Sequence, residues 1–239
     1  MDRTRRTLLA TLGTGATVGL AGCTDVLGGG GGGDGGGNTY LQPAEWEVDP
    51  SALPFPTHGD RLPAATLPAP LRDAESLTLP DDFTGRDTLL TFVYTHCMTM
   101  CPRLTAILEG VQDHVIDEGF PDEVAFVETT FDPSRDDAER LRQWAEDHHV
   151  AMDAGNWYFL RPETTARAKD VVQDTYGVSF TKTTPQDMDA YMFAHTGLVL
   201  LANRDGYVER AYKLQSSGEP QVRWQDVRED LTTLREREA

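Results

Sequence analysis

The chain has 239 residues, with 39 Asp and Glu against 21 Lys and Arg, and a formal net charge of −18. This length suits one domain with a full-sized core plus appendages. The charge excludes nucleic acid as a partner, because the sequence offers no basic patch that could release phosphate counterions. Only three of the basic residues are lysine. An acid-rich, lysine-poor composition keeps a surface hydrated in strong salt, which indicates a halophilic protein.

The first 22 residues predict an export signal. Arg5 and Arg6 lie in a motif that resembles a twin-arginine signal, and a mild apolar run follows at residues 10–20. This run is too short and too rich in Gly and Thr for a membrane span. The signal ends in Leu-Ala-Gly followed by Cys23, which resembles a lipoprotein box with Cys23 as the lipidated residue. The alternative is that Cys23 is an incidental cysteine in a cleaved peptide.

Three further segments are predicted after the signal. Residues 23–39 form a flexible tether, because nine of the ten residues 28–37 are glycine. Residues 40–61 are interrupted by prolines and predict an extended arm around the folded domain, which occupies residues 62–239. We expect the lipid to hold this domain at the outer face of the cytoplasmic membrane.

The central prediction is a buried strand that leads into a pair of cysteines. Residues 89–93 are an apolar run, and Cys97 and Cys101 follow in the turn before a helix expected to begin at Pro102. The helix dipole favours a thiolate at this position. Such a pair carries out redox chemistry, binds a soft metal, or does both.

The remaining elements predict an α/β domain. Its order of strand, helix, strand, helix, strand, helix, hairpin and helix indicates a thioredoxin-like sandwich. We expect short strands at 64–67 and 76–79, further strands at 124–130, 156–160, 194–202 and 207–212, and helices around Leu141 and Trp144, at 163–176 and at 219–237.

The C-x3-C spacing has several interpretations. A structural disulfide over so small a loop would constrain the unfolded chain only weakly. Thioredoxin-type reductases carry C-x2-C, so the extra residue weakens a simple redox interpretation. A peroxiredoxin needs a threonine three residues before its reactive cysteine, where this chain has Tyr94 and Met98.

A metal site would need a third ligand, and six histidines are candidates. His195 stands out because it opens the apolar strand expected over 194–202, although a histidine there is also typical of a hydrogen-bonded core residue. His96 precedes Cys97 and is expected to point away from it, since neighbouring residues of an extended segment face opposite sides. The others are expected in the arm or in solvent: His58, His114, His148 and His149.

Several motifs together resemble one family. They are Phe83-Thr84-Gly85-Arg86, Tyr94-Thr95-His96-Cys97-x3-Cys101-Pro102, Asp132-Pro133-x2-Asp136, Tyr176-Gly177-Val178, and His195 followed by Asp205-Gly206. In these motifs, residues from about 62 to 236 resemble the Sco/SenC family of thioredoxin-fold copper chaperones. The resemblance implies that Cys97, Cys101 and His195 bind one copper ion. Soft thiolates select Cu(I), and imidazole helps the same site hold Cu(II), whereas Zn²⁺ normally takes a fourth ligand.

The chain departs from the family pattern around these ligands. Met98, Thr99 and Met100 replace the usual residues between the cysteines, and Ala194 replaces an Asp before the histidine. Met98 and Met100 are either accessory thioether ligands or packing residues. Asp132 and Asp136 either support the site from behind or form only a turn and a helix cap.

The resemblance implies delivery of copper to the binuclear site in subunit II of a haem-copper oxidase. The main alternative is a thiol–disulfide oxidoreductase that keeps the copper-ligand cysteines of that subunit reduced, for which His195 would be dispensable. A copper or redox sensor is a third interpretation, with no sequence feature of its own.

Overall fold

The computed structural model describes residues 37–73, 75–184, 190–214 and 222–238. The predicted export signal with Arg5 and Arg6, the lipidation site Cys23, most of the tether and the first residues of the expected terminal helix lie outside the described residues. Within the described part, no helix is long and apolar enough to cross a bilayer.

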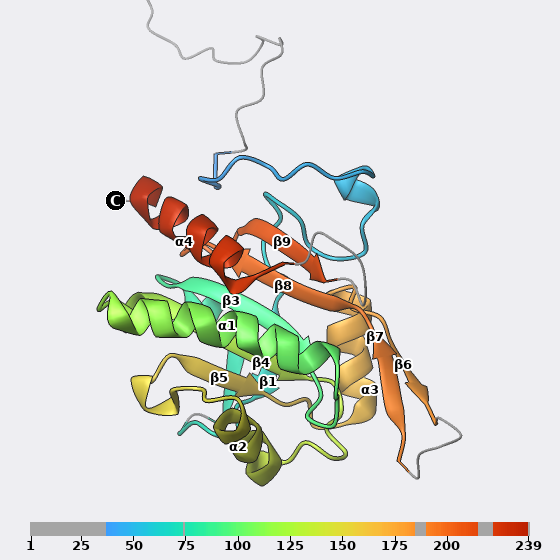
Figure 1. Cartoon of the computed structure of the whole chain (residues 1–239). Helices are drawn as coiled ribbons and strands as arrows, with labels where there is room; N and C mark the ends of the chain where they lie inside the picture. The colour runs from blue at the N-terminus through green and yellow to red at the C-terminus, as the bar shows by residue number, and fades with distance from the viewer. Residues whose placement is uncertain (1–36, 74, 185–189, 215–221, 239) are drawn as a thin grey trace, which may run out of the picture. The chain divides into compact units, whose positions relative to one another are not determined.

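In the part of the chain that the structure describes, nine strands form one central sheet and two hairpins (Figure 1). In the five-stranded sheet the order is β5-β4-β3-β8-β9. Strands β3, β4 and β5 run parallel to one another, β8 runs antiparallel to β3, and β9 runs antiparallel to β8. The hairpins pair β1 with β2 and β6 with β7. The strands are β1 (Ala65–Pro68), β2 (Ser76–Leu79), β3 (Asp87–Val93), β4 (Val124–Thr130), β5 (Trp157–Leu160), β6 (Phe180–Thr183), β7 (Met192–His195), β8 (Gly197–Ala202) and β9 (Val208–Leu214).

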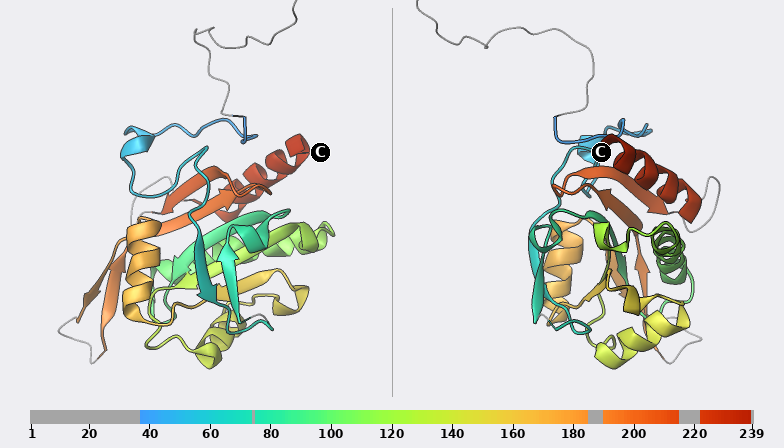
Figure 2. Two further views of the ribbon diagram at one scale, coloured as in Figure 1. Left: turned by 180° about the vertical axis from the view of Figure 1, so that it is seen from behind. Right: turned by 90° about the vertical axis from the view of Figure 1, so that its left-hand side faces the viewer.

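Helices lie on both faces of the sheet (Figure 2). They are α1 (Met100–Asp117), α2 (Ala138–Asp147), α3 (Thr165–Ala168), which continues as a π-helix over Lys169–Thr175, and α4 (Trp224–Glu238). The long helices α1 and α4 pack together on one face, while α3 and the β1–β2 hairpin lie on the other. Every residue of β3, β4 and β8 is buried, as expected for interior strands covered on both sides.

The strand predicted over 194–202 is two strands. Residues Met192–His195 pair with β6, and the N–H of Thr196 donates to the carbonyl of Ser179 before β8 begins at Gly197. His195 therefore ends β7 and does not open the sheet strand, which corrects the prediction. The β6–β7 hairpin projects beyond the sheet in Figure 1. His195 ends β7 two residues before β8 begins at Gly197.

The arm packs onto β9 and the end of the π-helix. The backbone N–H of Leu41 donates to the Glu209 carboxylate at 2.8 Å, and Phe55 is buried in the core. Gly177 has φ +67°, and a Cβ there would lie 1.8 Å from the carbonyl oxygen of Pro54. Only a glycine permits this close approach.

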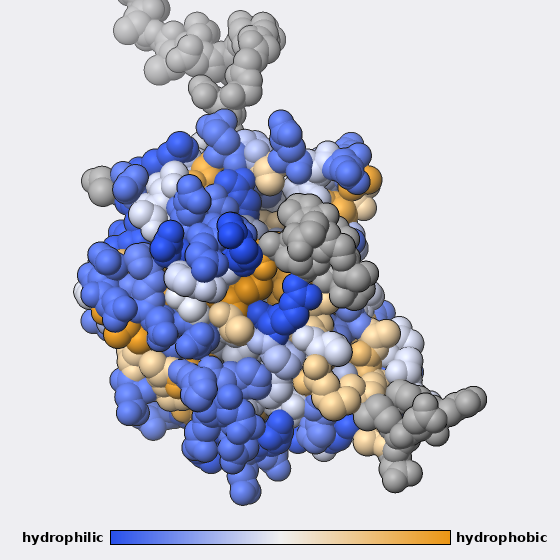
Figure 3. Space-filling model, viewed as in Figure 1, coloured by the Kyte–Doolittle hydropathy of each residue, from blue (hydrophilic) through white to orange (hydrophobic). Residues whose placement is uncertain are grey.

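The surface is largely hydrophilic, as Figure 3 shows for the face that carries α1 and α4. Among the described residues, the large apolar side chains that are exposed are Tyr40, Val48 and Met98. Two of these belong to the arm, and the third lies directly beside Cys97.

Candidate metal centre

Three potential ligands predicted from distant parts of the sequence meet at one point. The Sγ atoms of Cys97 and Cys101 and a ring nitrogen of His195 all lie within 4.8 Å of one another. His195 Nε2 is 3.3 Å from Sγ of Cys101 and 3.8 Å from Sγ of Cys97. Within the described part of the chain, this is the group of three Cys, His or acidic side chains placed to hold a metal ion.

The two cysteines occupy different environments. Helix α1 begins at Met100, two residues earlier than predicted, so Cys101 lies inside its first turn and is fully buried. The Cys101 sulfur accepts the backbone N–H of Tyr94 at 3.4 Å. The backbone N–H of Cys101 donates to Sγ of Cys97, also at 3.4 Å. Cys97 lies in the preceding turn, and both cysteines are free thiols.

These environments separate the two pKa values. The Cys101 thiol donates to Cys97 and, with help from His195, lowers the pKa of Cys97 to about 3. Burial, followed by the adjacent Cys97 sulfur, raises the pKa of Cys101 well above its usual value of 9.0. The pair therefore shares one proton, with the thiolate at Cys97, which is the form that binds soft metals and attacks disulfides.

His195 is oriented by the backbone of the next residue. Its Nδ1 lies 3.2 Å from the carbonyl oxygen of Thr196, and its Nε2 faces the two sulfurs. The rings of Tyr94 and Phe131 pack against the imidazole at centroid distances of 5.8 and 5.2 Å.

Asp136 holds the turn that carries Cys97. Its buried carboxylate accepts the N–H of Thr95 at 3.1 Å, the hydroxyl of Thr95 at 2.6 Å and the hydroxyl of Thr130. Arg140 from α2 donates to the carbonyl oxygen of Thr95 at 2.8 Å. These bonds fix the turn from behind, and Asp136 is not part of the ligand group.

Asp132 holds the strand that carries His195. Its carboxylate accepts the hydroxyl of Tyr191 at 2.8 Å and Nε of Arg135 at 2.6 Å, and Arg135 also donates to the carbonyl of Tyr191 at 3.0 Å. Tyr191 is the residue before β7 begins. The two acids thus position the two halves of the site. The sequence singled out neither Arg135 nor Tyr191, because their role depends on the β6–β7 hairpin.

The two methionines between the cysteines differ in their exposure to solvent. The Met98 side chain is 69% exposed, whereas Met100 is 8% exposed. Met100 packs against Gly197, where an added Cβ would lie 2.8 Å from the Met100 sulfur.

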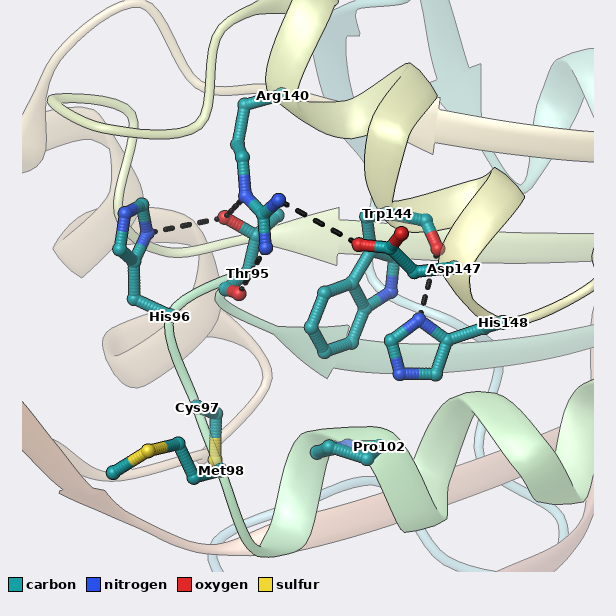
Figure 4. A pocket seen from close by; sticks show the side chains of 9 residues that line it. All are labelled: Thr95, His96, Cys97, Met98, Pro102, Arg140, Trp144, Asp147 and His148. Carbon is teal, nitrogen blue, oxygen red and sulfur yellow. Dashed lines mark hydrogen bonds and ion pairs between the residues drawn. The ribbon is translucent and has the colours of Figure 1, made fainter.

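A hollow of about 500 Å³ borders Cys97 on the side of α2 (Figure 4). His96 lies at one end, pointing away from the cysteine pair as predicted, with Nδ1 3.7 Å from a carboxylate oxygen of Asp136. His148 lies at the other end, half-buried with its ring 3.9 Å from that of Trp144. His148, which was expected in solvent, is thus only partly exposed, and so is His114, which packs against Phe120.

A family model described as SCO1/SenC matches residues 72–230. The chain belongs to the SCO1/SenC family. The family prediction and the predicted thioredoxin-like α/β fold are both confirmed. The human protein SCO2 homolog, mitochondrial, is 29% identical over 141 residues, a match that covers 58% of this chain and 49% of the human protein. The chain therefore spans about half the length of that relative.

Solved structures share the fold. The crystal structure of Arabidopsis thaliana ScoI with copper bound has a TM-score of 0.59 and 21% identity, and the match covers 74% of this chain and 99% of that one. BsSco, described as a member of the Sco family of cytochrome c oxidase assembly proteins in which a disulfide switch was identified, has a TM-score of 0.55 and 21% identity, with 73% and 92% of the two chains covered.

The donor set suits a soft metal ion. Two thiolates and one imidazole match the ligand preference of copper, and the deprotonated Cys97 is ready to bind. A structural zinc site would take a fourth ligand, and none of the described His, Cys, Asp or Glu side chains joins this group.

Proposed function

We propose that the chain binds one copper ion through Cys97, Cys101 and His195 and delivers it to the binuclear copper site of haem-copper oxidase subunit II. The observation that carries the proposal is the convergence of these three ligand atoms within 4.8 Å. Membership of the SCO1/SenC family, the copper in the Arabidopsis relative and the description of BsSco as an oxidase assembly protein support it.

Transfer proceeds by ligand exchange. The reduced cysteines bind Cu(I) through sulfur, and the imidazole of His195 allows the site to hold Cu(II) as well. A recipient thiolate or imidazole replaces these ligands one at a time, so copper is never released as a free ion.

We further propose that residues 1–22 direct export, that lipid on Cys23 anchors the mature chain to the outer face of the cytoplasmic membrane, and that residues 23–39 tether the arm (40–61) and the domain (62–239). A glycine-rich tether raises the effective concentration of the domain near a membrane-bound recipient. Residues 28–37, nine of them glycine, support this arrangement.

Copper transfer is the test of this proposal. The reduced chain is loaded with one equivalent of Cu(I) and mixed with the copper-free soluble domain of the oxidase subunit, and the metal content of both proteins is measured after separation. We expect copper on the recipient with the wild-type chain and with His114→Ala, which changes a histidine of α1 outside the site. Copper that stays on the chain, or that reaches the recipient equally well from His195→Ala, contradicts the proposal.

A second function has one observation in its favour. The paired thiols combine a thiolate at Cys97 with a buried thiol at Cys101, the arrangement of an attacking and a resolving cysteine. A thiol–disulfide oxidoreductase acting on the recipient would use both thiols and not His195. If His195→Ala reduces an oxidised recipient at the wild-type rate without copper, reductase activity is established as a separate function.

A further inference from the structure

The three proposed copper ligands are poorly accessible from solvent. Cys101 is fully buried, Cys97 is 5% exposed, and His195 is half-buried under aromatic rings. An incoming Cu(I) ion arrives with ligands of its own, so it cannot meet all three donors at once. A donor on the outside of the site would let the exchange begin.

Met98 lies where such a donor is needed. It follows Cys97 directly, its side chain is 69% exposed, and both side chains line the hollow between the cysteine turn and α2. Figure 4 shows both side chains among those that line this hollow. Elsewhere among the described residues, the exposed large apolar side chains are Tyr40 at 38% and Val48 at 54%, both in the arm and both less exposed than Met98.

Packing does not explain Met98. Met100, two residues later, is buried against Gly197 and fills space between α1 and β8. Met98 lies in a bend before the helix and leaves most of its surface in water. On a strongly hydrophilic surface, a polar residue would suit this bend equally well.

Resting on the copper-binding function proposed above, we infer that Met98 is the entry ligand for Cu(I). Its thioether and the Cys97 thiolate bind the ion first, as two of the ligands that the ion arrived with leave with their donor. The bond from copper to the Met98 sulfur then breaks as bonds to the Cys101 sulfur and His195 Nε2 form. The Cys101 thiol loses its proton to solvent in this step, and copper remains Cu(I) throughout.

The chemistry of the thioether gives the exchange a direction. A thioether is a soft, uncharged donor on a side chain with three rotatable bonds. It can therefore bind copper at the surface and dissociate from it readily. A thiolate binds Cu(I) more strongly, so the ion moves inward to Cys101. Met98 should therefore control the rate of loading and unloading more than the final affinity.

The first test is a rate measurement. The reduced full chain is mixed with the Cu(I)–bicinchoninate complex, and the loss of the complex's absorbance is followed by stopped flow. We expect Met98→Leu, which keeps the size of the side chain, to slow uptake by about tenfold. The matched control Met100→Leu should load at the wild-type rate. Equal rates for wild type and Met98→Leu overturn the inference.

The second test detects the bond itself. In Cys101→Ser the inward step is blocked, so Cu(I) should remain on Cys97 and Met98. With selenomethionine in place of methionine, copper-edge X-ray absorption should then show a Cu–Se contact. The contact should disappear in Cys101→Ser with Met98→Leu and persist in Cys101→Ser with Met100→Leu. No Cu–Se contact in Cys101→Ser overturns the inference.

The two proposals fail in different ways. If the wild-type chain takes up no Cu(I) from the chelator, copper binding itself is wrong and the entry role of Met98 falls with it. If wild type and Met98→Leu both load to one equivalent at the same rate, copper binding stands and the entry role alone is wrong.

Discussion

The hydroxyl of Tyr94 lies 3.2 Å from the backbone nitrogen of Phe193 and 3.5 Å from its carbonyl oxygen. It accepts the N–H and donates to the carbonyl, and burial raises the pKa of Tyr94 to about 12, so the donating proton is retained. The backbone N–H of Tyr94 points to the Cys101 sulfur. One residue thus joins the cysteine half of the site to the strand that ends in His195.

Replacing Tyr94 with Phe should weaken copper binding. The ring and its packing on His195 remain, but β7 loses both hydrogen bonds two residues before the ligand. We expect Cu(I) affinity, measured by chelator competition, to fall about tenfold, with a stability loss of about 1 kcal/mol. Tyr158→Phe is the control, because its hydroxyl bonds Arg86 at 2.6 Å outside the site. Equal copper affinity in the two variants would count against a positioning role.

Asp136→Asn should disturb Cys97 and spare the histidine strand. Three donors converge on this carboxylate, and an amide nitrogen in place of one oxygen leaves a donor unsatisfied at a cost of about 1–3 kcal/mol. Alkylation of Cys97 by iodoacetamide, followed by mass spectrometry, should change in rate. Asp132→Asn should leave this rate unchanged, since Asp132 bonds Arg135 and Tyr191 near β7. A normal rate in both variants contradicts the division of roles between the two acids.

Gly177→Ala should loosen the arm. Gly177 has φ +67°, and its Cβ would collide with the Pro54 carbonyl at 1.8 Å. Backbone strain and the clash together should cost about 2–5 kcal/mol in urea unfolding. Gly119→Ala is the matched control, with φ +81° and nothing within 4 Å of the added Cβ, so it should cost only about 1–2 kcal/mol. If both variants lose the same stability, the arm does not pack at Gly177 in solution.

Glu128 makes stability depend on pH. It is fully buried on β4, and burial raises its pKa from 4.5 to about 8 despite a 2.7 Å hydrogen bond from Thr105. The folded state holds this proton more tightly than the unfolded state. The preferential protonation of Glu128 in the folded state therefore stabilises the fold fully below pH 4.5, and this stabilisation is lost as the pH rises to about 8.

Glu128→Gln should remove this dependence. Between pH 5 and pH 8, stability of the wild type relative to the variant should fall by about 1.4 kcal/mol per pH unit. Urea unfolding at several pH values measures the slope. Parallel curves for the two proteins would show that Glu128 is ionised in the folded state.

The apolar runs of the sequence were sufficient to predict the sheet. β4 has the predicted bounds and β3 contains the predicted run, because both are interior strands that must be apolar on both faces. The β6–β7 hairpin could not be predicted in this way. The residues of β6 are mostly polar and show no apolar run, and the strand containing His195 begins with apolar residues that merged in the sequence with β8.

The meeting of the three candidate ligands was predictable and their surroundings were not. Cys97 and Cys101 stand at a strand-to-helix turn that the sequence indicates, and His195 does lie beside them although the strand predicted for it was wrong. Which methionine is exposed depends on the first residue of α1, and the helix begins at Met100, two residues before Pro102. The partners of Asp132 are set by the hairpin, which leaves no local signal in the sequence.

Copper stoichiometry in the three ligand variants tests the central claim most directly. The reduced chain and the variants Cys97→Ala, Cys101→Ala and His195→Ala are titrated with Cu(I) in competition with bicinchoninate, with His114→Ala as the control. We predict one tightly bound Cu(I) per chain for wild type and the control, and a marked loss of affinity in each ligand variant. Unchanged stoichiometry and affinity in all three ligand variants would contradict the copper site at Cys97, Cys101 and His195.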